Sequence, residues 1–230
     1  MTENDEAAGD GADLRDKGVS GSDGLISTYL NRPISGLISS RVAGWPVTPD
    51  QWTYAGFASV CAGAGAFAIG APRLGAMLVH AGSVLDGVDG EVARLQQATS
   101  AQGALLDLAL DRIGDVALAG GLALGAGGRT FDWLLALAAA NGSLTPGIVK
   151  ERVGHEGENV ARLQEEEAAG GALDALLPFT NRDGRLFAAT LLGLLRQPRL
   201  ALLWIAVTSN QRLVRRLQAA RAMLRRRAGE

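Results

Sequence analysis

The chain has 230 residues, 47% of them apolar, and a formal net charge of −2. This length is enough for one domain with a buried core. The near-zero charge gives no reason to expect nucleic acid as a partner. The single cysteine, Cys61, excludes a disulfide framework. Mean hydropathy is only slightly positive, because polar residues gather at the two ends of the chain.

Composition divides the chain into three parts. Residues 1–22 are acidic, glycine-rich and without an apolar run, which predicts a disordered tail. Residues 23–218 contain the long apolar stretches and are expected to form one membrane domain. Residues 219–230 end an arginine cluster that begins near residue 212, and they are expected to form a basic cytoplasmic tail. Such a cluster binds nucleic acid less often than it lies beside a membrane surface.

An amphipathic helix is expected upstream of the first long apolar stretch. Its apolar residues recur at helical spacing, with polar residues between them. They are Leu25, Ile26, Tyr29, Leu30, Ile34, Leu37 and Ile38. The pattern predicts a helix that lies on a membrane surface, and an ordinary helix packed on the domain is the alternative. Pro33 is a position at which this helix can divide.

Six apolar stretches follow, at residues 52–71, 74–92, 104–126, 131–149, 186–195 and 200–209. A membrane-crossing helix needs about 20 mostly apolar residues, so the last two stretches must include flanking residues. Their many Gly and Ala residues favour close packing of membrane helices, and a buried, alanine-rich soluble bundle is the alternative. The predicted fold is therefore all-α: a polytopic integral-membrane six-helix bundle with an N-terminal surface helix.

Local signals support this segmentation. Thr48, Pro49 and Gln51 have the spacing of a capping box that opens the first long helix. The orientation follows from the basic residues, because cytoplasmic loops carry an excess of Lys and Arg. With six crossings both termini share one side, and that side has most of these residues. We therefore expect a multi-pass protein of the plasma membrane with both termini in the cytoplasm.

Acidic residues interrupt the second and third apolar stretches. They are Asp86, Asp89, Glu91, Asp107, Asp111 and Asp115. Acidic groups at membrane depth are costly and face a cavity or a partner. Asp86 and Asp89 are three residues apart, and Asp107 and Asp111 are four apart, so each pair shares one face of a helix. Asp115 continues the second face by one turn and is expected to pair with Arg112 or with a neighbouring helix.

The polar link 96–102 is expected to be the tip of a helical hairpin. With the tip at Ala98, Asp89 and Asp107 are each nine residues away, about 13 Å along a helix. Asp86 and Asp111 match in the same way one turn deeper. Four carboxylates thus converge on one volume, where they cannot all remain ionised without cations. Oxygen ligands suit Mg²⁺ or Mn²⁺, and a carboxylate can also serve as a general base.

The spacing of these residues resembles the signature of the CDP-alcohol phosphotransferases, or CDP-alcohol phosphatidyltransferases, at every fixed position. The matching residues are Asp86, Asp89, Gly90, Ala93, Arg94, Gly103, Asp107 and Asp111. The resemblance implies a homodimeric membrane enzyme of six helices whose active site opens to the cytoplasm. Such an enzyme transfers a phospho-alcohol group from a CDP-alcohol to a second alcohol and releases CMP.

The resemblance also implies roles for single residues. Two Mg²⁺ or Mn²⁺ ions are expected on Asp86, Asp89 and Asp107, with Asp111 completing the metal site and acting as the catalytic base. The nucleotide-binding residues are expected to be Asp50, Gly90, Ala93, Arg94 and Gly103. Asp50 follows Thr48 and Pro49 where the family usually has Asn.

Further patches are similar to the di-myo-inositol-phosphate-phosphate synthase branch, which joins CDP-inositol to inositol 1-phosphate. They lie at residues 23–27, 31–35, 82–91, 141–143, 150–152 and 181–187. Phosphatidyl transfer from CDP-diacylglycerol to inositol phosphate or glycerol phosphate is the runner-up. A non-catalytic membrane protein that binds or transports cations is a third reading.

An inositol phosphate acceptor requires cations near the metal site. The candidates are Lys150, Arg152, Arg182 and Arg185, at the cytoplasmic ends of the fourth and fifth predicted helices. Anchoring of these ends at the membrane surface is an equally good reason for their charge. The expected partners are therefore a CDP-alcohol donor, an alcohol acceptor and membrane lipid.

Overall fold

A computed structural model describes residues 27–153 and 181–228, and every regular element in these ranges is helical. A short π-helical turn, η1 (Ser27–Asn31), leads into α2 (Arg32–Val42). The long helices are α3 (Pro49–Ala68), α4 (Pro72–Leu95), α5 (Ala101–Gly125), α6 (Thr130–Val153), α8 (Arg182–Leu194) and α9 (Pro198–Ala228). The prediction of an all-α fold is confirmed, and each predicted apolar stretch coincides largely with one of these six helices.

The structure describes only one of the two predicted tails, the one at residues 219–230, and describes it as far as residue 228. The predicted tail at residues 1–22 lies outside the described residues. At the other end, α9 continues without a break past residue 218, as far as Ala228. By length, hydropathy and charge, no helix in the described ranges meets the requirements of a membrane-crossing helix.

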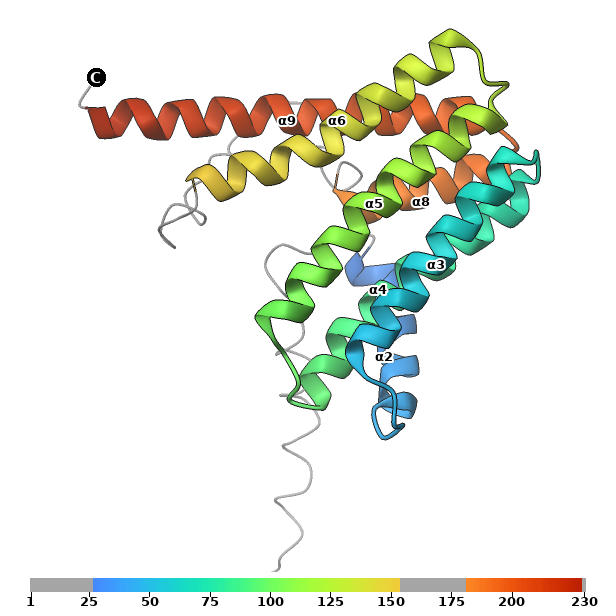
Figure 1. Cartoon of the computed structure of the whole chain (residues 1–230), viewed down its shortest axis with the longest axis vertical. Coiled ribbons are helices and arrows are strands. Elements are labelled where there is room, and N and C mark those ends of the chain that lie inside the picture. Colours follow the sequence, from blue (N-terminus) through green and yellow to red (C-terminus); the bar gives the residue numbers. More distant parts are fainter. Residues whose placement is uncertain (1–26, 154–180, 229–230) are drawn as a thin grey trace, which may run out of the picture.

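Some helices pack against neighbours along the chain, as α3 does against α4, and others pack against helices distant in sequence, as α6 does against α9. In Figure 1, α3, α4 and α5 lie side by side, and α6 runs beside α9. α8 contacts both α4 and α9, so it joins the first group of helices to the last one. The core between them is apolar and contains Phe67, Val79, Leu118, Leu122 and Leu202. This packing brings the start of α8 towards the middle of α4 and α5.

Hydrogen bonds at helix ends determine where the functional helices begin. The backbone N–H of Thr48 donates to Gln51 Oε1 at 3.0 Å, as the predicted capping box requires. Ser100 Oγ accepts from the backbone N–H of Gly103 at 3.0 Å and caps α5. Asn181 Oδ1 accepts from the backbone N–H of Gly184 at 2.8 Å. This last cap makes Arg182 the first residue of α8.

Glycines allow the helices of the first group to approach closely. A Cβ at Gly121 on α5 would lie 2.2 Å from the carbonyl oxygen of Ala64 on α3. Gly63 and Gly75 face each other's backbone in the same way, with a Cβ-to-oxygen distance of 2.9 Å on each side. Gly120, by contrast, has no atom within 4 Å of its Cβ position. The expectation that small residues permit close packing therefore holds for some of these glycines and not for others.

The N-terminal helix packs on α4 through polar side chains and, near its end, through Val42 and Ile38. Asn31 Nδ2 donates to Ser83 Oγ at 3.0 Å, and Ser35 Oγ donates to Glu91 Oε1 at 2.8 Å, both on α4. Tyr29 is 77% exposed, and Leu37 and Ile34 are also exposed. The start of the segment therefore exposes apolar residues, as the predicted surface helix requires, while its end packs on the domain as in the alternative.

An ion pair with a buried carboxylate joins three helices at the opposite end of the molecule. Arg199 on α9 donates to Asp132 on α6 through Nε at 2.7 Å and Nη2 at 3.0 Å. The same guanidinium donates to the carbonyl oxygen of Ala126, at the end of α5, at 2.6 Å. Asp132 is fully buried. This Asp132–Arg199 pair lies far from the acidic residues that the sequence singles out.

Gly121→Ala is expected to destabilise the protein, while Gly120→Ala is not. The added methyl group at residue 121 meets the backbone of α3, which cannot move without separating two helices, so we expect a loss of about 1–3 kcal/mol. At residue 120 the methyl group enters open space, and we expect a gain of about 0.4–1 kcal/mol from the lower entropy of the unfolded chain. Thermal unfolding of both variants in the same detergent measures the difference, and equal midpoints would contradict the packing described.

Candidate active site

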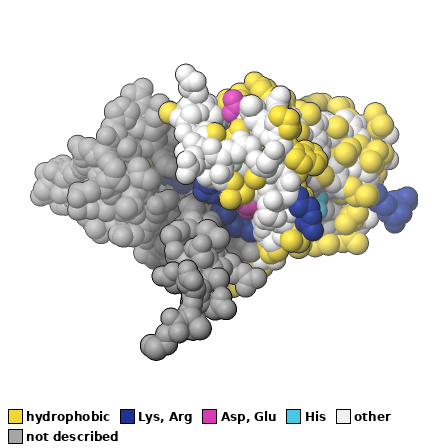
Figure 2. Space-filling model, turned by 90° about the horizontal axis from the view of Figure 1, so that it is seen from below, with side chains coloured by type: hydrophobic (Ala, Val, Ile, Leu, Met, Phe, Trp, Pro, Cys, Tyr) yellow, Lys and Arg dark blue, Asp and Glu magenta, His cyan; other side chains and the backbone are white. Residues whose placement is uncertain are grey.

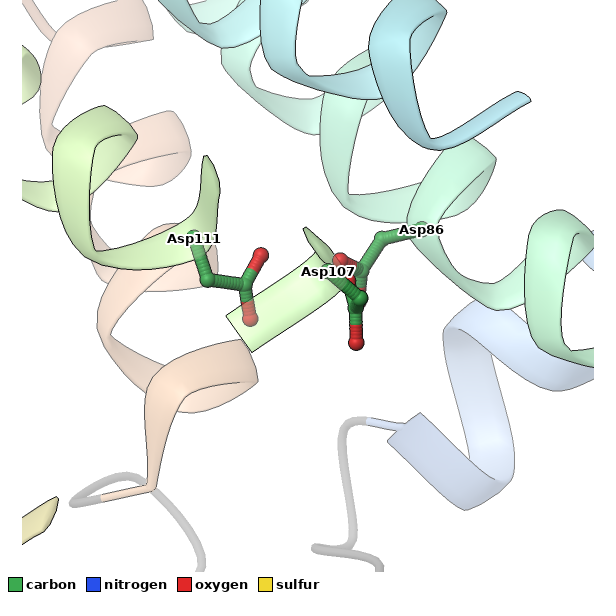
Figure 3. A group of neighbouring side chains, drawn as sticks. All are labelled: Asp86, Asp107 and Asp111. Carbon is green, nitrogen blue, oxygen red and sulfur yellow. The ribbon is translucent and has the colours of Figure 1, made fainter. Parts of the chain in front are cut away.

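Three carboxylates converge between α4 and α5. Asp86 projects from α4, and Asp107 and Asp111 project from α5, four residues apart on one face (Figure 3). One oxygen of each lies within 4.8 Å of one oxygen of each of the others. The hairpin of α4 and α5, with its link at residues 96–100, therefore brings these three predicted ligands together.

Asp89 lies outside this group of three. Its carboxylate is 7% exposed and accepts a hydrogen bond from Thr53 Oγ1 on α3 at 2.7 Å. Thr53 was not among the residues that the sequence analysis selected, because nothing in its local sequence points to α4. Asp89 remains a predicted metal ligand, and Thr53 is the residue that holds its present orientation.

The donor set fits a hard divalent cation. All three residues supply carboxylate oxygens, which Mg²⁺ and Mn²⁺ prefer. Asp107 Oδ1 is buried and has no hydrogen-bond partner in the described part of the chain. A buried carboxylate oxygen without a partner is costly, and coordination to a cation would satisfy it.

Arg182 neutralises part of this acidic group. Its Nη1 lies 3.0 Å from Asp86 Oδ1 and its Nη2 lies 2.7 Å from Asp111 Oδ1. The sequence analysis selected Arg182 as a ligand of the acceptor phosphate. The structure places it beside the predicted metal site and in contact with two of the predicted metal ligands.

Asp115 connects the cations around the group. Its carboxylate lies 3.3 Å from Arg112 Nη1, 3.5 Å from Arg182 Nε and 3.8 Å from Arg185 Nη2. It also accepts a hydrogen bond from the hydroxyl of Ser143 on α6. The predicted pairing of Asp115 with Arg112 is confirmed. The contact with Ser143 was missed, since only the packing of α5 against α6 reveals it.

The predicted nucleotide residues lie around the linked end of the hairpin, on either side of residues 96–100. A Cβ at Gly90 would have only the terminal Nη1 of Arg94 nearby, at 3.5 Å, so the backbone of α4 is accessible there. A Cβ at Gly103 would lie 3.4 Å from Asp50 Oδ1, which brings the start of α3 beside the start of α5. Arg94 is exposed and Ala93 is half-buried. These positions leave space beside the carboxylates for a bound group.

The other predicted ligands of the acceptor phosphate are Lys150, Arg152 and Arg185. Lys150 and Arg152 belong to the last turns of α6, but their side chains lie outside the described residues. Arg185 is described and is 6% exposed. Of the four predicted basic residues, Arg182 therefore contacts Asp86 and Asp111, and Arg185 lies beside Asp115.

Comparison with known proteins gives consistent matches. The family model for CDP-alcohol phosphatidyltransferase matches residues 46–149. The bifunctional IPC transferase and DIPP synthase of Rubrobacter xylanophilus is 38% identical over 202 residues, which are 87% of this chain and 43% of that protein. The archaetidylinositol phosphate synthase of Pyrococcus horikoshii is 32% identical over 88 residues, which are 38% of this chain and 47% of that protein. The chain thus spans less than half the length of these relatives.

Solved structures show the same fold. Two crystal structures of the phosphatidylinositol phosphate synthase PgsA1 of Mycobacterium tuberculosis match with TM-scores of 0.57 and 0.58, both at 24% identity. The first, with CDP-DAG bound, is matched over 82% of this chain and 94% of that chain. The second, in complex with manganese and citrate, is matched over 81% and 88%. The eight-residue motif, the helical fold around it and the match over residues 46–149 agree: the chain belongs to the CDP-alcohol phosphatidyltransferase family.

Proposed function

We propose that the chain transfers a phospho-alcohol group from a CDP-alcohol to the hydroxyl group of a second alcohol, with release of CMP. The observation that carries this proposal is the convergence of Asp86, Asp107 and Asp111, with a buried oxygen of Asp107 that has no hydrogen-bond partner in the described residues. Such a site suits two Mg²⁺ or Mn²⁺ ions, held by these residues and Asp89. Bound there, the ions would neutralise the donor's diphosphate and stabilise the leaving phosphate.

In this proposal Asp111 acts as the general base. It takes the proton of the acceptor hydroxyl, whose oxygen then attacks the phosphorus that carries the donor's alcohol. The bond from this phosphorus to the bridging oxygen of CMP breaks, and CMP leaves with the electron pair. The accessible backbone at Gly90 supports binding of the cytidine beside the diphosphate, with Asp50, Ala93, Arg94 and Gly103 around it.

For the substrates, we propose CDP-inositol and inositol 1-phosphate, joined to di-myo-inositol phosphate phosphate. The similarity to the DIPP synthase of Rubrobacter xylanophilus supports this choice, since it covers 87% of the chain. Arg182 and Arg185, next to the carboxylates, are suited to an acceptor that carries a phosphate. Phosphatidyl transfer from a CDP-linked lipid is the second candidate, favoured by the similarity to an archaetidylinositol phosphate synthase.

We further propose that the protein is a multi-pass membrane protein, with its active site and both termini on the cytoplasmic side. Many large apolar side chains are exposed on α5, α6, α8 and α9, among them Leu105, Leu137, Leu195 and Val207. Figure 2 shows apolar side chains over much of the described part of one face. Exposure on this scale is unusual for a soluble monomer. The outward apolar side of η1 and α2 suits the membrane surface, and the family resemblance supports a homodimer.

Asp107→Asn and Asp111→Asn are each expected to lower CMP release from a CDP-alcohol by at least about 10³-fold, because each loses a metal ligand or the base. Asp132→Asn, which removes a buried carboxylate at the other end of the molecule, is the matched control and should retain activity. Chelation should abolish the wild-type rate, and Mg²⁺ or Mn²⁺ should restore it. Equal CMP release by the wild type and all variants would refute the proposed enzymatic activity.

The donor is tested by supplying inositol 1-phosphate with either CDP-inositol or CDP-diacylglycerol. We expect product with CDP-inositol, because the chain matches a bifunctional IPC transferase and DIPP synthase over 87% of its length. Mass spectrometry of the products identifies the transferred group. Product with CDP-diacylglycerol but not with CDP-inositol would establish phosphatidyl transfer instead.

Membrane association is tested by alkaline carbonate extraction of cell membranes. A protein held by hydrophobic contact remains in the membrane pellet, whereas one attached through charge is released. We expect the chain in the pellet and in the detergent extract of that pellet. Recovery in the carbonate supernatant would contradict the membrane proposal.

A further inference from the structure

Asp115 lies outside the family motif, yet it has more charged and polar partners than any motif residue in the described part of the chain. It belongs to α5, one turn beyond Asp111, and its contacts come from α5, α6 and α8. Its side chain is 11% exposed, so water screens these contacts only weakly. A buried carboxylate with partners on three helices is held in one orientation.

Arg182 uses different nitrogens for different carboxylates. Nη1 and Nη2 bond to Asp86 and Asp111, two residues of the predicted metal site. Nε points to Asp115, 3.5 Å from Oδ1, and it has no hydrogen-bond partner among residues 27–153 and 181–228. The bonds to the metal residues and the contact with Asp115 are therefore separable, because no nitrogen serves both.

Cation binding changes the balance of these contacts. Carboxylates that ligate a divalent cation lose most of their attraction for a neighbouring guanidinium, and the two cations repel each other. Arg182 would then be expelled unless another anion retained it. Asp115 is placed for this, since Ser143 and Arg112 hold its carboxylate from outside the group of Asp86, Asp107 and Asp111.

We infer that Asp115 is a positioning residue that retains Arg182 beside Asp86 and Asp111 when these two residues bind a divalent cation. Arg182 then presents Nη1 and Nη2, released from the carboxylates, to the phosphate of the acceptor. In the structure the same guanidinium pairs with Asp86 and Asp111 and neutralises part of their charge. The inference rests on the proposed function for the identity of the acceptor, but not for the competition between Arg182 and the cation.

The competition is measured with Mn²⁺ alone, by titration calorimetry on the full chain without nucleotide. Arg182→Gln should tighten Mn²⁺ binding roughly tenfold, because it removes a competing cation. In the wild-type background, Asp115→Asn should weaken Mn²⁺ binding about tenfold. In the Arg182→Gln background, the factor by which Asp115→Asn weakens Mn²⁺ binding should be at least about fivefold smaller. An equal loss in both backgrounds would show that Asp115 acts on the cation through its charge alone, and would overturn the inference.

The positioning role is measured by steady-state kinetics. Asp115→Asn should raise the KM for the phosphorylated acceptor about tenfold, with kcat and the donor KM changed less than about twofold. Asp132→Asn is the matched control: it also removes a buried carboxylate paired with an arginine, and it should leave the ratio of the two KM values unchanged. A fall in kcat with unchanged acceptor KM, or the same KM ratio in both variants, would overturn the role.

The two measurements separate the possible failures. If no CDP-alcohol yields CMP, the proposed function fails, and the Mn²⁺ titrations still decide whether Arg182 and Asp115 act together. If CMP is released but the titrations show no dependence of Asp115 on Arg182, the inference fails and the proposed function stands.

Discussion

The crowding of negative charge between α4 and α5 is the constraint on which the active site depends. Asp86, Asp107 and Asp111 lie together in a place that water reaches only partly, and their mutual repulsion must be offset. Arg182 supplies one positive charge and reaches two of the three. Asp107 keeps an oxygen that has no hydrogen-bond partner in the part of the chain that the structure describes. The arrangement is therefore incomplete without a further cation, which is what a metal-dependent phosphotransferase requires.

Close helix packing makes this crowding possible. Gly63 and Gly75 let the backbones of α3 and α4 touch, and Gly121 does the same for α3 and α5. Thr53 on α3 is thereby brought to Asp89. At the far end, the pair of Asp132 and Arg199 ties α5, α6 and α9 together. The two ends of the bundle thus use charge differently: Asp132 and Arg199 form a structural pair, while Asp86, Asp107 and Asp111 carry more negative charge than Arg182 offsets.

The η1 and α2 segment packs on α4, the helix that carries Asp86 and Asp89. This segment packs its polar side chains on α4, through Asn31 with Ser83 and Ser35 with Glu91. Glu91 lies only two residues from Asp89, so the same helix carries site residues on one side and the N-terminal segment on the other. Tyr29, Ile34 and Leu37 of the segment are exposed, while Val42 and Ile38 pack with Val88 and Val92. A membrane surface at this position would bring a water-soluble or lipid-linked donor directly to the hairpin.

Spacing within each helix was enough to determine much of this protein. The intervals between Asp86 and Asp89, and between Asp107 and Asp111, place each pair on one helix face, because 3.6 residues complete a turn. Capping residues and apolar stretches located the helices. Distances along the chain cannot say which residues of other helices meet these faces, since that depends on how the helices pack. Only the tertiary structure brought Arg182 to Asp111, Ser143 to Asp115 and Thr53 to Asp89. It also distinguished Gly121, where an added Cβ would meet the backbone of α3, from Gly120, where an added Cβ would enter open space.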